Sequence, residues 1–144
     1  MTTRLARKSI RIRVKAGDTD FTGFIFHPRI IEWFSAGRIE LLRSKKIALL
    51  KDGSLSVDGQ QQKVSIVVGE VYARFHGPIK FDDLVCLQTR ISEIRDKTIK
   101  FDFVIKHVGD DRPLVTGYST SVCVDRETRR ATSIPARMVE LLTT

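Results

Sequence analysis

The hydrophobic and polar positions divide the chain into one segment with helical spacing and several with strand spacing. Over residues 28–44, apolar side chains recur every three or four positions, which is the period of one helix face. That stripe consists of Ile30, Phe34, Gly37 and Leu41. Because its middle is small, another layer can approach the helix axis closely. The pattern predicts a long helix that is enwrapped by a sheet.

Five other segments have the pattern of β-strands. Residues 9–14 alternate between polar and apolar side chains, and four longer runs are rich in β-branched residues. These runs are 64–75, 84–94, 98–108 and 113–124. Short polar turns separate neighbouring runs, which predicts antiparallel pairing.

The remaining segments are short. Residues 51–63 are polar and rich in glycine and glutamine, so we interpret them as a loop that follows a helical turn at 46–50. A last helix is expected over 136–142, after Pro135. A strand, a long helix and then four strands in a row predict an α+β fold with one antiparallel sheet. At 144 residues, the chain is interpreted as a single domain, 1–144.

The composition is that of a globular protein, with 42% hydrophobic residues and no apolar run near the ~20 residues of a membrane span. A net charge of +8 favours an anionic partner, although solubility alone explains it equally well. Cys86 and Cys123 lie singly in apolar runs, which favours reduced thiols and a cytoplasmic location. Residues 1–15 carry only basic charges but already contain a strand pattern, so a cleaved presequence is not expected.

Most of the common motifs of catalysis and binding are missing. His27, His76 and His107 lie far apart without a cysteine or carboxylate at ligand spacing, which argues against a zinc site. There is no nucleophile elbow, P-loop or dinucleotide fingerprint. The chain is basic but has no basic helix face and no aromatic-basic strand, so no nucleic acid partner is expected.

An acidic turn, in which Asp18 and Asp20 flank Thr19, runs directly into the predicted helix. The helix dipole favours acids near a helix N-terminus, so turn formation alone accounts for them. The same geometry suits catalysis, because free N–H groups near His27 can hold the oxygen of a polarised carbonyl. A carboxylate facing that carbonyl attacks it or activates water, and Gly23 leaves room for the ligand. The spacing leaves both interpretations open.

The acidic turn and the segment after it strongly resemble the hot-dog-fold thioesterases. The match is best to the 4-hydroxybenzoyl-CoA thioesterase family, including its Tol-Pal-associated acyl-CoA thioesterase branch. The family signature is D-x-D-x-x-G leading into the hot-dog helix, and here it is met by Asp18, Asp20 and Gly23. Matching segments are 17–34, 36–43, 78–83 and, weakly, 134–135. The resemblance implies a hot-dog fold, in which an antiparallel sheet wraps around one long central helix.

By this resemblance, Asp20 matches the catalytic carboxylate, which acts on the thioester as nucleophile or general base. His27 occupies the position whose backbone N–H polarises the thioester carbonyl, and a histidine there is typical of the Tol-Pal branch. Gly23 completes the signature, and Asp18 is expected to brace the turn. That branch has a tyrosine four residues before the catalytic aspartate, where this chain has Ala16. Any role of the phenol must therefore be absent or be supplied by another group.

The resemblance further implies a homodimer or homotetramer with active sites at subunit interfaces. The CoA tail of the substrate lies on the surface, where basic residues hold it. Positions that correspond to nucleotide-contacting residues are Arg95, Lys97 and Thr98, with Arg129 and Arg130 as looser candidates. A solvated turn explains each of these side chains equally well. No metal or redox cofactor is implied.

Apolar residues near the turn divide into core and pocket candidates. Trp33 and Phe34 are expected in the core, whereas Phe21, Phe24 and the segment 51–63 are candidates for an acyl pocket. The leading hypothesis is hydrolysis of an acyl-CoA or aroyl-CoA to the free acid and CoA. A non-catalytic acyl-CoA-binding hot-dog protein and a hot-dog hydratase or dehydratase remain as alternatives. The hydratase motif expects an Asp and a His about five residues apart, whereas Asp20 and His27 are seven apart.

Overall fold

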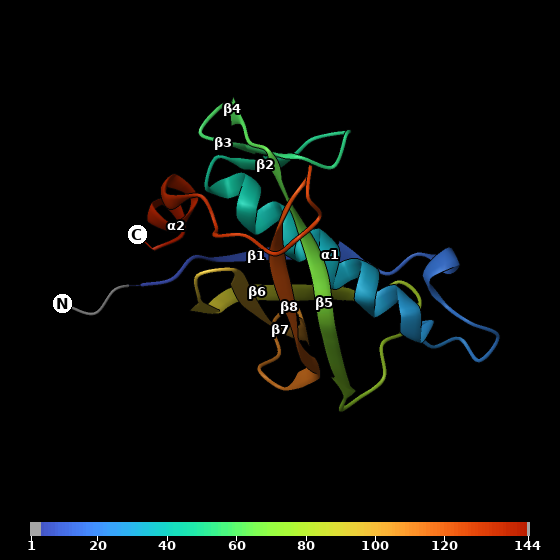
Figure 1. Ribbon diagram of the computed structural model, residues 1–144. Coiled ribbons are helices and arrows are strands. Elements are labelled where there is room, and N and C mark those ends of the chain that lie inside the picture. The colour runs from blue at the N-terminus through green and yellow to red at the C-terminus, as the bar shows by residue number, and fades with distance from the viewer. Residues whose placement is uncertain (1–3, 144) are drawn as a thin grey trace.

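The computed structural model describes residues 4–143, which form two α-helices, one short 3-10 helix and eight strands (Figure 1). The helices are η1 (Ala16–Asp18), α1 (His27–Ser44) and α2 (Ala136–Leu142). The long strands are β1 (Arg7–Arg13), β5 (Val64–Phe75), β6 (Leu84–Ile94), β7 (Thr98–His107) and β8 (Pro113–Asp125). The short strands are β2 (Ile47–Leu49), β3 (Leu55–Val57) and β4 (Gln60–Gln61).

The five long strands form one antiparallel sheet in the order β1-β6-β7-β8-β5. Strands β6, β7 and β8 follow one another through short turns, as predicted, and β1 and β5 are left as the two edges. Along β6 and β7, buried and more exposed residues alternate, because successive side chains point to opposite faces. One face of the sheet therefore carries the large apolar side chains.

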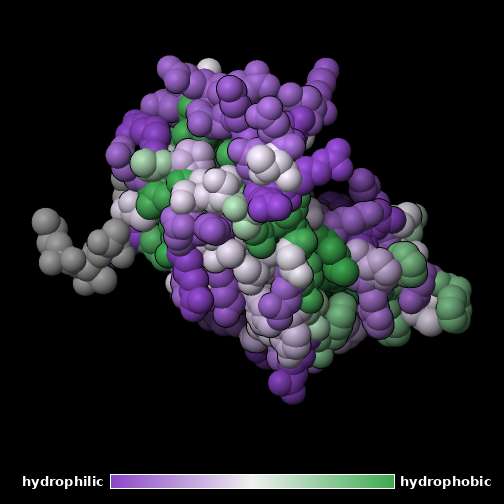
Figure 2. Space-filling view, in the orientation of Figure 1, coloured by the Kyte–Doolittle hydropathy of each residue, from purple (hydrophilic) through white to green (hydrophobic). Residues whose placement is uncertain are grey.

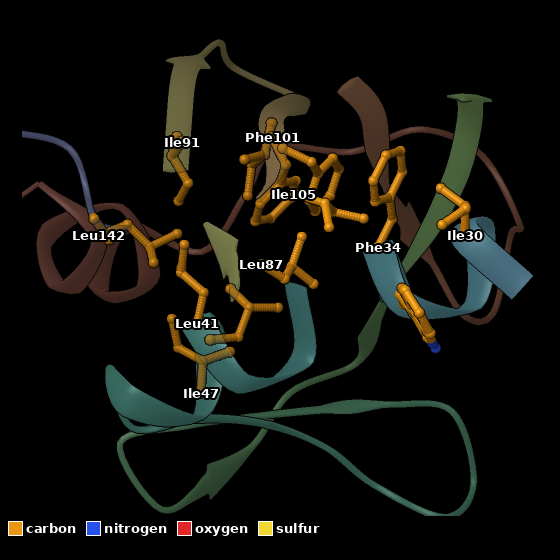
Figure 3. Close-up of a cluster of buried hydrophobic side chains, with 14 of the residues drawn as sticks. Ile30, Phe34, Leu41, Ile47, Leu87, Ile91, Phe101, Ile105 and Leu142 are labelled. Carbon is orange, nitrogen blue, oxygen red and sulfur yellow. The ribbon is translucent and has the colours of Figure 1, made fainter. Parts of the chain in front are cut away.

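Helix α1 packs on this apolar face, and the core lies between the two (Figure 3). The predicted stripe is fully buried at Ile30, Phe34 and Leu41. The Phe34 ring stacks on Phe103 of β7 with 4.2 Å between ring centroids. At Gly37, helix and sheet approach so closely that a Cβ would lie 2.4 Å from Oγ1 of Thr89. This close approach explains why the middle of the stripe is small.

Two predictions for the segment after α1 are wrong. Residues 46–50 do not form a helical turn but contain β2, and residues 51–63 are not a plain loop, since they contain β3 and β4. Together these strands make a second, three-stranded antiparallel sheet in the order β2-β3-β4, so the prediction of one sheet is also wrong. Lys46 has a left-handed φ of 62°, which ends the helical path, and Ile47 is then buried against the fold.

The predicted α+β class is confirmed, with antiparallel sheets and two α-helices. The bounds of β5, β6 and α2 are as predicted, and α1 begins one residue earlier, at His27. Trp33 and Phe34 lie in the core, as expected. Among residues 4–143, no helix is long and apolar enough to cross a membrane.

Candidate active site

The acidic turn lies between β1 and α1 and is attached to the segment that precedes β6. Single bridges pair Thr19 with Ile25 and Phe24 with Lys80, and the N–H of Ile25 donates to the carbonyl of Ile79 at 2.8 Å. The turn therefore lies against the body of the molecule near its base, while Figure 1 shows its tip projecting beyond the N-terminal end of α1.

Asp18 braces the turn, as expected. Its buried carboxylate accepts a hydrogen bond from the backbone N–H of Lys15 at 2.9 Å and forms an ion pair with Arg29 at 3.2 Å. Its own carbonyl accepts the N–H of Phe26 at 2.8 Å. Since Arg29 lies in the first turn of α1 and Phe26 immediately precedes that helix, the turn and the helix N-terminus are fixed relative to each other.

Asp20 is held differently, with only one of its carboxylate oxygens engaged. Oδ1 accepts the backbone N–H of Thr22 at 2.7 Å and also the Thr22 hydroxyl. Among residues 4–143, no hydrogen bond within 3.5 Å and no ion pair reaches Oδ2. The Thr22 bonds hold the pKa of Asp20 below its ordinary value, and the charge of nearby His27 and the nearby backbone N–H of Phe24 lower that pKa further. Asp20 is therefore an ionised carboxylate with one free oxygen.

The Thr22 hydroxyl gives the first testable prediction. Replacing Thr22→Val removes the side-chain donor but keeps the backbone N–H, so the pKa of Asp20 should rise towards its ordinary value. A carboxyl-selective NMR titration of wild type and variant measures this directly. An unchanged Asp20 midpoint in the variant would show that the hydroxyl does not stabilise the carboxylate.

His27 is the first residue of α1 and supplies an unused backbone donor. The N–H of Phe26 is taken by Asp18, the N–H of Arg29 donates to the Phe26 carbonyl at 2.8 Å, and Pro28 has no N–H. Within the described residues, the N–H of His27 has no acceptor. First-turn N–H groups carry the positive end of the helix dipole, so this group is suited to an oxyanion. The exposed His27 ring lies 4.6 Å from the Phe75 ring at the end of β5.

Gly23 lies between Asp20 and His27, and the structure gives a reason for a glycine there that the sequence analysis did not. Its φ is +85°, a conformation that side chains with a Cβ rarely adopt, whereas a Cβ there would meet nothing within 4 Å. The N–H of Gly23 donates to the carbonyl of Asp20 at 3.2 Å and closes the turn. Gly23 is thus needed for the direction of the backbone between Asp20 and α1.

The predicted CoA-contacting residues lie at the other end of the sheet. Thr98 begins β7 beside the turn that holds Arg95 and Lys97, and Arg129 follows the end of β8. The acidic turn instead lies near Phe75, which pairs with the opposite end of β8. Seven residues of β7 separate the two ends, or roughly 20 Å. One copy of the chain does not bring these residues to Asp20, and Arg95 pairs with Glu93 at 2.7 Å.

Exposed apolar side chains surround the candidate site and continue along β5. Phe21 is fully exposed at the tip of the turn, and Phe24 and Phe26 are nearly half exposed. The β5 edge also exposes Val67, Val68, Val71, Tyr72 and Phe75. Figure 2 shows hydrophobic surface over this part of β5 and α1 and at the tip of the turn. The sequence could not reveal this exposure, because a β-branched run looks the same in an edge strand as in a buried one.

Among residues 4–143, no group of three histidine, cysteine or carboxylate side chains is placed to hold a metal ion. The acidic turn and the start of α1 present an ionised carboxylate and a free backbone N–H from the same short stretch of chain.

Comparison with known proteins places these features in a family. The family model described as the thioesterase-like superfamily matches residues 14–142. The acyl-CoA thioesterase YbgC of Haemophilus influenzae is 30% identical over 94 residues, which are 65% of this chain and 65% of that protein. This alignment thus spans slightly less than two thirds of the relative. The acyl-CoA thioester hydrolase YbgC of Escherichia coli is 24% identical over 139 residues, 96% of each chain.

A solved structure agrees with the sequence relatives. The probable thioesterase from Bartonella henselae superposes with a TM-score of 0.76 and is 29% identical. The match covers 90% of this chain and 100% of that one. The architecture built from the β1–β6–β7–β8–β5 sheet and α1 is therefore shared beyond the segment that carries the acidic turn.

Proposed function

Because the chain belongs to the thioesterase-like superfamily, we propose that it hydrolyses an acyl-CoA or aroyl-CoA thioester to the free acid and CoA. The single observation that carries the proposal is the pairing of an ionised Asp20, with Oδ2 unengaged, and the free N–H of His27 in one turn. Thioester hydrolysis needs both a base or nucleophile and an oxyanion donor.

The thioester carbonyl oxygen accepts the His27 N–H, and the helix dipole of α1 stabilises the negative charge that develops on that oxygen. Oδ2 of Asp20 then acts on the carbonyl carbon in one of two ways. As a general base it takes a proton from water, whose oxygen adds to the carbon. As a nucleophile it forms a mixed anhydride that water cleaves. In both routes the carbon–sulfur bond breaks, and CoA leaves as a thiolate that becomes protonated.

Two neighbours modify this assignment. The His27 ring is close enough to Asp20 to favour its ionised form, which supports a side-chain contribution to the electrostatics of the site. Ala16 lies in η1, where its carbonyl accepts the Thr19 hydroxyl at 2.7 Å. A methyl group stands where the Tol-Pal branch has a phenol, so the proposed mechanism uses no phenol from this position.

We also propose that the site is completed by a second copy of the chain, paired through the edge of β5. Within residues 4–143, this edge has no neighbouring strand, and it exposes apolar side chains, a combination that favours pairing with another strand. In a two-fold antiparallel pair, the start of the partner's β5 lies beside the end of β5 in the first copy. The partner's turn at 95–98 and its Arg129 then lie at the same end as Asp20, where they can hold the CoA phosphates.

A charge on β5 tests this arrangement. Val71 and Val108 are both 36% exposed, but only Val71 lies on β5. Val71→Lys should raise the dimer dissociation constant by about 100-fold or more, because a buried unpaired charge costs several kcal/mol. Val108→Lys is the matched control and should leave the dimer intact. Sedimentation velocity measures both, and a monomeric wild type or a fully dimeric Val71→Lys protein would refute the β5 interface.

The activity itself is tested with a panel of acyl-CoA and aroyl-CoA esters and an acyl carrier protein thioester, with thiol release as the readout. We expect hydrolysis of at least one CoA ester without added metal. Tight binding of the esters with no turnover would instead support an acyl-CoA-binding protein. A protein that neither binds nor hydrolyses any of these esters would refute the proposal.

Two further expectations belong with this function. We propose that α1 is the central helix about which the sheet wraps, which its fully buried stripe at Ile30, Phe34 and Leu41 supports. We also propose a reducing, cytoplasmic setting, which is supported by the unpaired thiols of Cys86 and Cys123.

A further inference from the structure

The face of the sheet that points away from α1 carries a cavity with no role in the proposed reaction. Phe103 stacks on α1, so the side chains of Asp102 and Val104 point to the opposite face. By the same alternation, Thr89 approaches α1 at Gly37, which directs Gln88 and Arg90 away from it. In the pairing of β1 with β6, Arg7 lies opposite Arg90 and Ser9 lies opposite Gln88. The side chains of Arg7 and Ser9 are therefore on this outer face as well.

These side chains line a cavity of about 500 Å³. Its lining includes Arg7, Ser9, Gln88, Arg90, Asp102 and Val104. The volume falls within the range of roughly 300–1,000 Å³ that small-molecule sites occupy. The acidic turn does not line it, so the thioester group that reacts at Asp20 does not lie in this cavity.

The charges in the cavity are unbalanced. Arg7 lies directly across from Arg90, and like charges at opposed positions of neighbouring strands destabilise a sheet. Asp102 forms an ion pair with Arg90 at 3.2 Å, whereas the guanidinium of Arg7 has no partner among residues 4–143. The side chains of Ser9 and Gln88, one row further along, also have no hydrogen-bond partner within the described residues.

The basic character continues beyond the cavity. Two rows from Arg7 and Arg90, Arg11 and Lys106 flank Cys86 on the same face, and neither has an ion-pair partner in the described part of the chain. A second copy of this face would meet it with the same charge, so self-association through it is disfavoured. The occupant that neutralises this surface must be an anion.

We propose that this cavity binds a diphosphate-bearing small molecule. The diphosphate lies between Arg7 and Arg90, since the planar guanidinium group pairs with phosphate through two parallel hydrogen bonds. Ser9 and Gln88 supply the neutral donors and acceptors for the rest of the molecule. Arg11 and Lys106 add to the positive potential that attracts it.

Titration calorimetry with inorganic diphosphate, ADP and adenosine tests the proposal on the full chain. We expect saturable binding of ADP or diphosphate and none of adenosine. Binding of both anions identifies the diphosphate as sufficient, whereas binding of ADP alone adds the nucleoside to what the cavity recognises. No saturable binding of either anion at millimolar concentration would overturn the proposal.

Three variants locate the site. Arg7→Gln should raise the dissociation constant about tenfold or more, as expected for loss of a charge-assisted pair. Arg43→Gln removes the same charge from α1, which packs on the opposite face of the sheet, and should change the dissociation constant less than about twofold, because distant surface charges are screened. Ser9→Tyr fills the cavity without changing charge and should also weaken binding. Arg7 and Ser9 are exposed and have no side-chain partners, so both variants should fold, which a melting curve verifies.

Equal losses in Arg7→Gln and Arg43→Gln, or wild-type affinity in Ser9→Tyr, would mean diffuse attraction to a basic protein and would overturn the site. A third outcome is that the protein binds a single-stranded oligonucleotide but neither diphosphate nor ADP, and that Arg7→Gln loses this binding. That result would assign the face to a polyanion and would also overturn the proposed diphosphate site.

Discussion

Asp20→Asn is expected to lower kcat on the best CoA ester by about 10³-fold, because the substitution removes the group that acts as base or nucleophile. The amide oxygen of asparagine can still accept the Thr22 N–H and hydroxyl bonds that Oδ1 accepts now. The turn should therefore keep its shape, and KM should change little, since the loss concerns the transition state.

Asp52 provides a matched control for this variant. Its Oδ1 accepts the backbone N–H of Ser54 at 2.9 Å and the Ser54 hydroxyl at 2.6 Å, which repeats the arrangement of Asp20 and Thr22. These bonds likewise hold the pKa of Asp52 below its ordinary value. Asp52→Asn should leave kcat within about twofold, since it lies outside the acidic turn. An Asp20→Asn protein with wild-type kcat would exclude Asp20 from the chemistry.

Gly117→Ala is expected to cost about 3 kcal/mol of the free energy of unfolding, the largest stability effect we expect from a single methyl group. A Cβ at Gly117 would lie 2.2 Å from the carbonyl oxygen of Tyr72 and 2.8 Å from the Phe34 ring. The first of these is backbone of the paired strand β5, so the sheet itself must move. Overpacking of this kind typically costs 1–3 kcal/mol and more where backbone is displaced.

Urea unfolding of wild type and variant measures the loss. Gly69→Ala is the control, because a Cβ there would meet nothing closer than 3.5 Å, which is ordinary contact. Its cost should stay below about 1 kcal/mol. Equal stability of the Gly117 variant and wild type would mean that β5 and α1 are not packed against β8 as described.

The long elements could be predicted from the sequence because their apolar periods extend over many residues. The stripe of α1 repeats through about three turns, and β5 to β8 are long runs separated by clear polar turns. In contrast, β2, β3 and β4 have two or three residues each, too few to establish a period. The Asp58-Gly59 pair, both with φ above 50°, was the signal for the β3–β4 hairpin.

The candidate site divides in the same way. Asp20, Gly23 and His27 are close in sequence, so a local motif was enough to place them in one turn. Whether Arg95 and Thr98 lie near Asp20 depends instead on the strand order and on the proposed pairing between copies. The spacing of residues along one chain gives information on neither of these. Asp18 and Asp20 looked equivalent from their spacing, and the family resemblance assigned the chemistry to Asp20 and the bracing role to Asp18. The burial of Asp18 and its pair with Arg29 supply the physical basis for the bracing role.

The two edges of the sheet have opposite characters, and this difference limits how the protein can assemble. The β1 edge carries Arg7, Lys8, Arg11 and Arg13, and charged side chains on an edge strand discourage further strands from adding. The β5 edge is apolar and open to pairing, but a two-fold contact uses it on both copies at once. In the proposed dimer, growth then stops, because only the charged edges remain. Under this proposal, the protein can expose a long hydrophobic edge strand without extending into fibres.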